Sequence, residues 1–207
     1  MKTKVVEYLG LPASGKSWQL LNDGYCKNKN AVAHSVPLGG GKIKTINTIK
    51  GTLHNLKLSF LLYRIAILIC SQDKSKFLLR PFFVIPERYG RILYLRKTDY
   101  SEVHVDEGVF QFIWRVFSEQ ENSHKNLLLL EKCISLLNLK EHSIAYVSCP
   151  KEKHISQVIE RKKVNSNFDA GVVNGDDQTY IRGRYWMSQV LKILRKYNFE
   201  IDFIWNK

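Results

Sequence analysis

Short apolar runs alternate with amphipathic stretches along this chain of 207 residues. Apolar runs bounded by turn residues are typical of buried parallel strands, and they predict strands at 4–9, 31–38, 102–108, 142–150 and 199–205. Apolar positions at helical spacing predict helices at 16–21, 108–118, 126–139, 151–160 and 185–197. This alternation favours an α/β fold: a three-layer α/β/α sandwich with a mostly parallel, five-stranded sheet.

Residues 43–100 interrupt the alternation with a helical insertion in an otherwise single domain of residues 1–207. Apolar residues recur there three and four apart around Leu53 and Phe60, and Pro81 and Pro86 are expected to interrupt the helical pattern. The insertion is the candidate acceptor region because it carries five arginines: Arg64, Arg80, Arg88, Arg91 and Arg96.

The strongest chemical signal is Gly-Leu-Pro-Ala-Ser-Gly-Lys-Ser at residues 10–17, which fits the phosphate-binding pattern G-x-x-x-x-G-K-[ST] between a strand and a helix. The glycines let the backbone N–H groups face phosphate oxygens. Lys16 is expected to reach the β- and γ-phosphates, and the Ser17 hydroxyl to ligate Mg²⁺. The predicted nucleotide-binding residues here are Gly10, Leu11, Pro12, Ala13, Ser14, Gly15, Lys16, Ser17 and Trp18.

Two carboxylates end the strand at 102–108, where ligands bind in a doubly wound sheet. Asp106 matches the Walker B position, which holds Mg²⁺ directly or through water. Glu107 is placed to accept a proton from an attacking hydroxyl or water. Lys16, Asp106 and Glu107 are therefore the predicted catalytic residues of this part of the chain, and Ser17 and Asp106 the predicted metal ligands.

The net charge of +13 is concentrated in the first half of the chain. Residues 1–100 hold 17 Lys and Arg against 5 Asp and Glu, whereas residues 101–207 hold 15 against 14. This excess of positive charge indicates an anionic partner, such as an acidic second substrate or, less favoured, a nucleic acid; a solvated basic surface is the alternative.

Cysteine usage and hydropathy predict a reduced, cytoplasmic setting. The apolar run at 58–70 is too short to span a bilayer and carries Arg64, so a buried helix is expected. The cysteines lie far apart without a CxxC pair, which argues against a zinc site, and with no secretory signal in view they argue against a disulfide framework. They are Cys26, Cys70, Cys133 and Cys149.

Residues 3–25 and 100–205 resemble the P-loop class of nucleoside and nucleotide kinases, including the thymidylate-kinase-like and other small-molecule kinases. In that family a strand–proline element precedes a helix that ends in arginine, and then a lid. Here Pro150 precedes the predicted helix at 151–160, and a polar stretch follows it. The resemblance implies a lid at 161–184, in which Arg161, assisted by Arg182 or Arg184, binds the nucleotide phosphates and stabilises the transferring group.

The resemblance implies an ATP-dependent phosphotransferase that uses Mg²⁺ and transfers the γ-phosphoryl group to a small acceptor such as a nucleotide, a sugar or a related metabolite. No acceptor-gripping motif stands between Val36 and Arg64, and the Asp-Glu-Gly at 106–108 differs from the family's Asp-Arg element. The acceptor therefore stays open. The alternative is an ATPase switch or regulator in which Glu107 activates water and a nucleic acid or acidic protein controls turnover.

Overall fold

A parallel β-sheet forms the centre of the computed structural model, which describes residues 3–22, 31–34, 41–61, 80–137, 139, 142–160 and 167–206. The sheet order is β2-β3-β1-β4-β5, and all neighbouring strands pair in parallel. The strands are β1 (Lys4–Leu9), β2 (Ala31–His34), β3 (Glu102–Asp106), β4 (His142–Ser148) and β5 (Glu200–Trp205). The parallel arrangement agrees with the predicted α/β fold.

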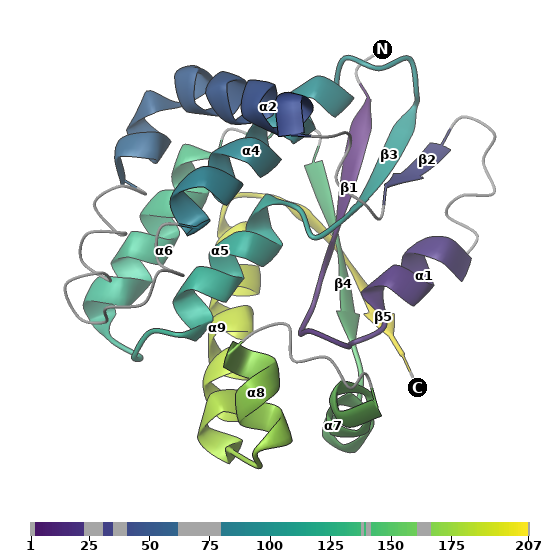
Figure 1. Cartoon of the computed structure of the whole chain (residues 1–207), viewed down its shortest axis with the longest axis vertical. Coiled ribbons are helices and arrows are strands. Elements are labelled where there is room, and N and C mark those ends of the chain that lie inside the picture. Colours follow the sequence, from purple (N-terminus) through teal and green to yellow (C-terminus); the bar gives the residue numbers. More distant parts are fainter. Residues whose placement is uncertain are drawn as a thin grey trace.

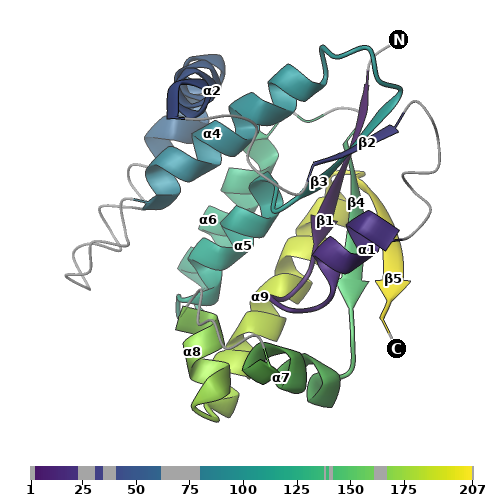
Figure 2. The same ribbon diagram turned by 45° about the vertical axis from the view of Figure 1, so that its right-hand side comes forward.

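Helices cover the sheet on both faces (Figures 1 and 2). Helices α5, α6 and α9 pack on one face and α1 on the other, while α2 lies on α4 outside α5. No helix in the described part of the chain is long and apolar enough to cross a membrane. The helices are α1 (Lys16–Asn22), α2 (Gly41–His54), α4 (Arg80–Leu95), α5 (Val109–Ser118), α6 (His124–Leu136), α7 (Lys151–Glu160), α8 (Asn167–Val173) and α9 (Asp177–Lys196).

Alternate side chains of β1 point into two apolar cores. Val5 and Leu9 join the larger core, which α5, α6 and α9 complete. Val6 and Tyr8 join a smaller core that includes Leu20 of α1. Burial on both faces explains why the sequence of β1 is largely apolar. The same packing anchors the loop that follows β1.

Two prolines that were expected to interrupt the insertion lie within a continuous helix instead. Pro81 is the second residue of α4, where a helix needs no backbone N–H donor. Pro86 lies inside α4, and its carbonyl contacts Gly51 at the crossing with α2, where a Cβ on that glycine would lie 1.9 Å from the carbonyl oxygen. Packing of α4 against α2 and α5 stabilises the helix despite the lost hydrogen bond.

The secondary structure expected around the predicted lid needs correction, in the polar stretch and at the start of the next helix. Residues 167–173, expected to form a polar lid stretch, are the helix α8. Helix α9 begins at Asp177, before Arg182 and Arg184, so both arginines lie inside it. Its cap explains the early start, because the Asp176 side chain accepts hydrogen bonds from the N–H groups of Gln178 and Thr179.

Several expectations fall outside the described residues. They concern Arg161 and the start of the lid, Arg64, and the end of the second predicted strand at 35–38. Of the apolar run at 58–70, the structure describes residues 58–61, of which Leu58 and Leu61 are buried and Phe60 is 65% exposed.

Candidate active site

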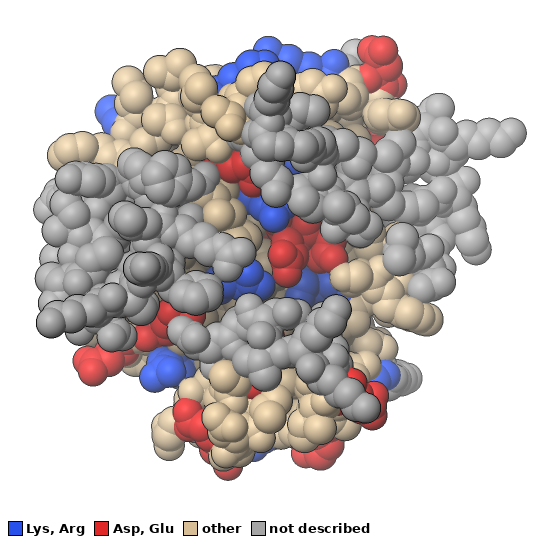
Figure 3. Space-filling view, in the orientation of Figure 1, with Lys and Arg blue, Asp and Glu red and all other residues tan. Residues whose placement is uncertain are grey.

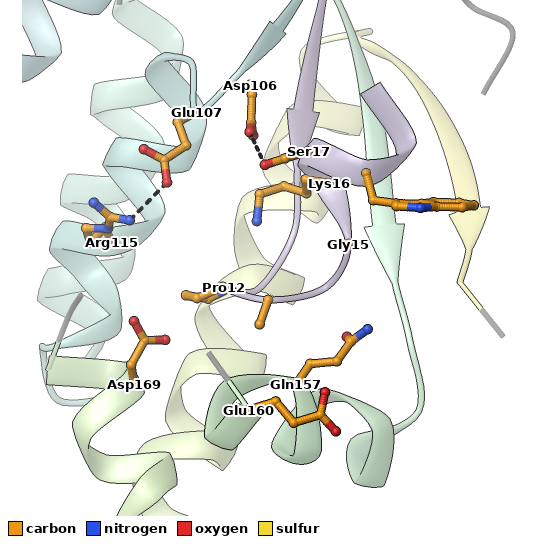
Figure 4. A pocket seen from close by; sticks show the side chains of 12 residues that line it. Pro12, Gly15, Lys16, Ser17, Asp106, Glu107, Arg115, Gln157, Glu160 and Asp169 are labelled. Atoms are coloured by element: carbon orange, nitrogen blue, oxygen red, sulfur yellow. Dashed lines mark hydrogen bonds and ion pairs between the residues drawn. The ribbon is translucent and has the colours of Figure 1, made fainter. Parts of the chain in front are cut away.

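The loop between β1 and α1 has the backbone shape of a phosphate-binding loop. Ala13 and Gly15 adopt positive φ angles of 62° and 91°. The Lys16 ammonium donates hydrogen bonds to the carbonyls of Gly10 and Leu11, at 3.1 and 2.9 Å. The lysine thus lies across the loop, with its Nζ at the pocket where phosphates are expected to bind (Figure 4).

Asn206, the residue that follows β5 at the edge of the sheet, contacts the loop. The Asn206 side chain donates to the Ser14 carbonyl at 3.1 Å and accepts from Lys153 Nζ at 3.2 Å. A Cβ on Gly15 would lie 2.4 Å from Asn206 Nδ2. A side chain at position 15 is therefore excluded both by its positive φ and by this neighbour. Sequence reasoning missed Asn206, which lies almost the whole chain away from the loop.

Ser17 and Asp106, the two predicted metal ligands, are in direct contact. Ser17 Oγ donates to Asp106 Oδ2 at 2.5 Å (Figure 4). Asp106 is buried, and its other carboxylate oxygen, Oδ1, has no hydrogen-bond partner. A buried carboxylate oxygen beside a hydroxyl is a fitting donor set for Mg²⁺, which takes only one or two protein ligands when substrate phosphates and water supply the rest. Within the described residues no larger metal-binding cluster of His, Cys, Asp and Glu is found.

Glu107 forms one wall of the pocket with Arg115. Its backbone has a φ of 53°, a conformation uncommon for residues other than glycine. Its carboxylate lies 3.4 Å from Arg115 Nη2 on α5, and both side chains are partly exposed. The Arg115 guanidinium also lies over the ring of Phe112, 5.1 Å from its centroid. Glu107, the predicted base, therefore lies at the pocket, and Arg115, a cation that the sequence did not predict, lies beside it.

These residues surround a cavity of about 470 Å³. This volume lies in the range of small-molecule sites, which is roughly 300–1,000 Å³. In the space-filling view, acidic and basic side chains lie next to each other around a hollow near the centre of this face (Figure 3). From α7 and α8, Gln157, Glu160 and Asp169 line the opposite wall (Figure 4). Sequence reasoning missed these three residues and Arg115.

A buried histidine supports the phosphate-binding loop from α7. His154 is 1% exposed and its Nε2–H donates to the Pro12 carbonyl, so the proton of the neutral ring is on Nε2. Burial lowers the pKa of His154, and the nearby Lys16 ammonium lowers it further, whereas the hydrogen bond to Pro12 opposes the shift. The ring is therefore neutral at physiological pH.

The predicted lid arginines do not gather at the pocket in the described part of the chain. Arg182 donates through Nε to the Ser118 carbonyl at 3.0 Å, at the end of α5, and it does not line the pocket. Arg184 lines a much smaller cavity behind the loop, together with Leu11, Ser14 and His154. Helix α9 thus directs Arg182 toward α5 and Arg184 toward the back of the loop.

The insertion contributes a buried arginine whose charge interacts with that of Asp106, the predicted metal ligand. Arg91 of α4 is 1% exposed. Burial lowers its pKa to about 10, the neighbouring Arg88 adds to this shift, and Glu87 and Asp106 oppose it. The charges of Glu87 and Asp106 therefore favour the protonated form of this buried guanidinium.

Comparison with known proteins supports the fold alone. The sequence matches no protein-family model and no curated protein. Among solved structures, the thymidylate kinase of Candida albicans superposes on the chain with a TM-score of 0.58 and 13% sequence identity, covering 100% of this chain and 85% of that one. That thymidylate kinase has a broad substrate specificity and a novel structural element. The chain therefore has the fold of P-loop kinases.

Proposed function

We propose that this protein is a Mg²⁺- and ATP-dependent phosphotransferase that moves the γ-phosphoryl group to a small acceptor. The observation that carries the proposal is the contact between Ser17 and Asp106 beside Lys16, at the mouth of a cavity of about 470 Å³. A metal ion bound there would neutralise phosphate charge. Lys16 would exchange its loop carbonyls for phosphate oxygens, which orients the group for in-line transfer.

We assign the acceptor to the side of the pocket formed by Asp106 and Glu107 at the end of β3 and by Arg115 of α5. Glu107 would act there as the base for an acceptor hydroxyl, Arg115 lines this side, and the charge of the buried Arg91 adds to its positive potential. An anionic acceptor, such as a nucleotide or sugar phosphate, fits these guanidinium groups. The kinase fold and the large share of the chain that it covers favour transfer over hydrolysis, and Arg161 keeps its proposed role at the transferring phosphate.

The position of Glu107 directly after Asp106 favours a second candidate, an ATPase switch controlled by a nucleic acid or an acidic protein. Acceptor dependence separates the two functions. ATP consumption is measured with Mg²⁺ alone and with pools of nucleosides, nucleotides, sugar phosphates or nucleic acids. Stimulation by one small-molecule pool, with a phosphorylated product detected by mass spectrometry, supports the transferase. Stimulation by a polymer alone, or steady unstimulated hydrolysis, supports the switch instead.

A further inference from the structure

A buried carboxylate lies where β1 passes beneath the first turn of α5. Glu7 is 0% exposed, and each of its oxygens has a partner. Oε1 accepts from the backbone N–H of Gln111 at 2.9 Å, and Oε2 accepts from His142 Nε2 at 3.3 Å. An apolar core excludes a carboxylate unless such partners replace water, so this pair of contacts fixes the side chain in one orientation.

The carboxylate of Glu7 caps α5 from another strand. The helix begins after Gly108, which has no side chain to satisfy the first N–H groups, and Gln111 is its third residue. A Cβ on Gly108 would lie 2.3 Å from the Glu7 carboxylate. Position 108 is a glycine because the Glu7 carboxylate occupies the space that any larger side chain would need.

The side chain of Gln111 then connects the helix to the phosphate-binding loop. Its Oε1 accepts from the backbone N–H of Gly10 at 3.1 Å, and Gln111 is 1% exposed. The carbonyl of the same glycine accepts from Lys16. A Cβ on Gly10 would lie 2.4 Å from the Val147 carbonyl oxygen. Gly10 is thus constrained in three ways: its N–H and its C=O are hydrogen-bonded, and its Cα has no room for a side chain.

These contacts form a closed ring from Glu7 to the start of α5, through Gln111 to Gly10, and back along β1. We propose that Gln111 and Glu7 are positioning residues, which fix the distance between the phosphate-binding loop and the two carboxylates Asp106 and Glu107. The inference rests on the proposed function, because it concerns the loop that would bind the nucleotide phosphates. Glu7 and Gln111 are 0% and 1% exposed and Gly10 is buried, so bulk water does not compete for these hydrogen bonds.

The experiment compares Gln111→Met, which removes the acceptor for the Gly10 N–H, with a matched control. Thr3→Val also removes a hydrogen bond of a buried residue, from Thr3 Oγ1 to the Thr98 carbonyl at 2.8 Å, but at the other end of β1. Thermal unfolding is followed for each variant, and Mg·ADP affinity is measured by calorimetry well below the unfolding transition. Both variants are expected to unfold at a lower temperature, but only Gln111→Met is expected to raise Kd, by about tenfold or more, because the loop shifts from its binding position.

Equal Mg·ADP affinity of Gln111→Met and the unmodified protein refutes the positioning role and leaves the proposed function intact. An affinity loss of the same size in Thr3→Val refutes it too, because the loss would then result from lower stability rather than from the position of the loop. Failure of the unmodified protein to bind Mg·ADP refutes the proposed function and the inference with it. If Gln111→Met does not fold, Gln111→Asn, whose amide is one methylene shorter, is expected to show the same loss, and unchanged affinity in that variant refutes the role.

Discussion

Replacing Asp106 by Asn tests the proposed metal site with little change in shape. The Asn amide oxygen can still accept the hydrogen bond from Ser17 Oγ, which the structure places at 2.5 Å from Asp106 Oδ2. The change removes the negative charge and puts an amide NH₂ group, which cannot bind a cation, at the position of the partnerless Oδ1. We therefore expect the variant to fold normally and to lose Mg²⁺-dependent binding.

The size of the loss follows from the burial of this carboxylate. Two unit charges about 4 Å apart interact by about 4 kcal/mol at an effective dielectric constant of about 20. The double charge of Mg²⁺ increases this energy, and water in the open pocket screens it. Taking about 3 kcal/mol as the net loss, and about 1.4 kcal/mol for each tenfold change, we expect Mg·ADP to bind about 100-fold more weakly.

The assay is calorimetric titration of ADP with Mg²⁺ and with EDTA in its place. Asp106→Asn is expected to weaken binding only in the presence of Mg²⁺. The control is Asp202→Asn, which removes an exposed carboxylate of β5 and changes the net charge equally. If Asp106→Asn binds Mg·ADP as tightly as the unmodified protein, or if the control weakens binding as much, the assignment of Asp106 to the metal is wrong.

Three further predictions concern the loop, the pH dependence and the insertion. Lys16→Ala is expected to lower the affinity for ADP and ATP at least tenfold, measured by calorimetry, because the charge at the phosphates is lost; unchanged affinity contradicts the site. The pKa of His154 is lowered in the folded state, so its contribution to the free energy of unfolding is complete above the unfolded pKa of about 6.5 and is lost as pH falls from there through the lower folded-state pKa. Urea unfolding at pH 5–8 is expected to show a smaller acid-side decrease in His154→Gln, whose amide can still donate to Pro12; the same decrease in both proteins argues against this role. Gly90→Ala is expected to destabilise the protein by about 1–3 kcal/mol, because its Cβ would lie 2.0 Å from the Asn47 carbonyl oxygen; an unchanged unfolding midpoint contradicts the close helix crossing.

Local patterns predicted the elements that carry the loop and the carboxylates. The predicted strands at 4–9 and 102–108 and the glycines of the loop depend on neighbouring residues in the sequence, so β1, α1 and β3 were predicted within two residues of their observed bounds. The start of α9 was placed too late, because polar residues precede its apolar face, although Asp176 is a recognisable cap.

The missed site residues depend on contacts between distant parts of the chain. Arg115 lies two helical turns into α5, and only the fold brings it to Glu107. Gln111 is separated from Gly10 by 101 positions. Neither residue belongs to a motif, and their roles follow from the packing of α5 on the sheet, which local spacing does not report.

The hydrogen bonds of Lys16 have a kinetic consequence. The loop carbonyls of Gly10 and Leu11 hold the ammonium group, and Ala13 and Gly15 have the positive φ angles that a phosphate-binding turn requires. Nucleotide association then requires a change of partners by one side chain rather than refolding of the loop. We therefore expect association in a single phase whose rate rises linearly with nucleotide concentration, without a slow isomerisation step.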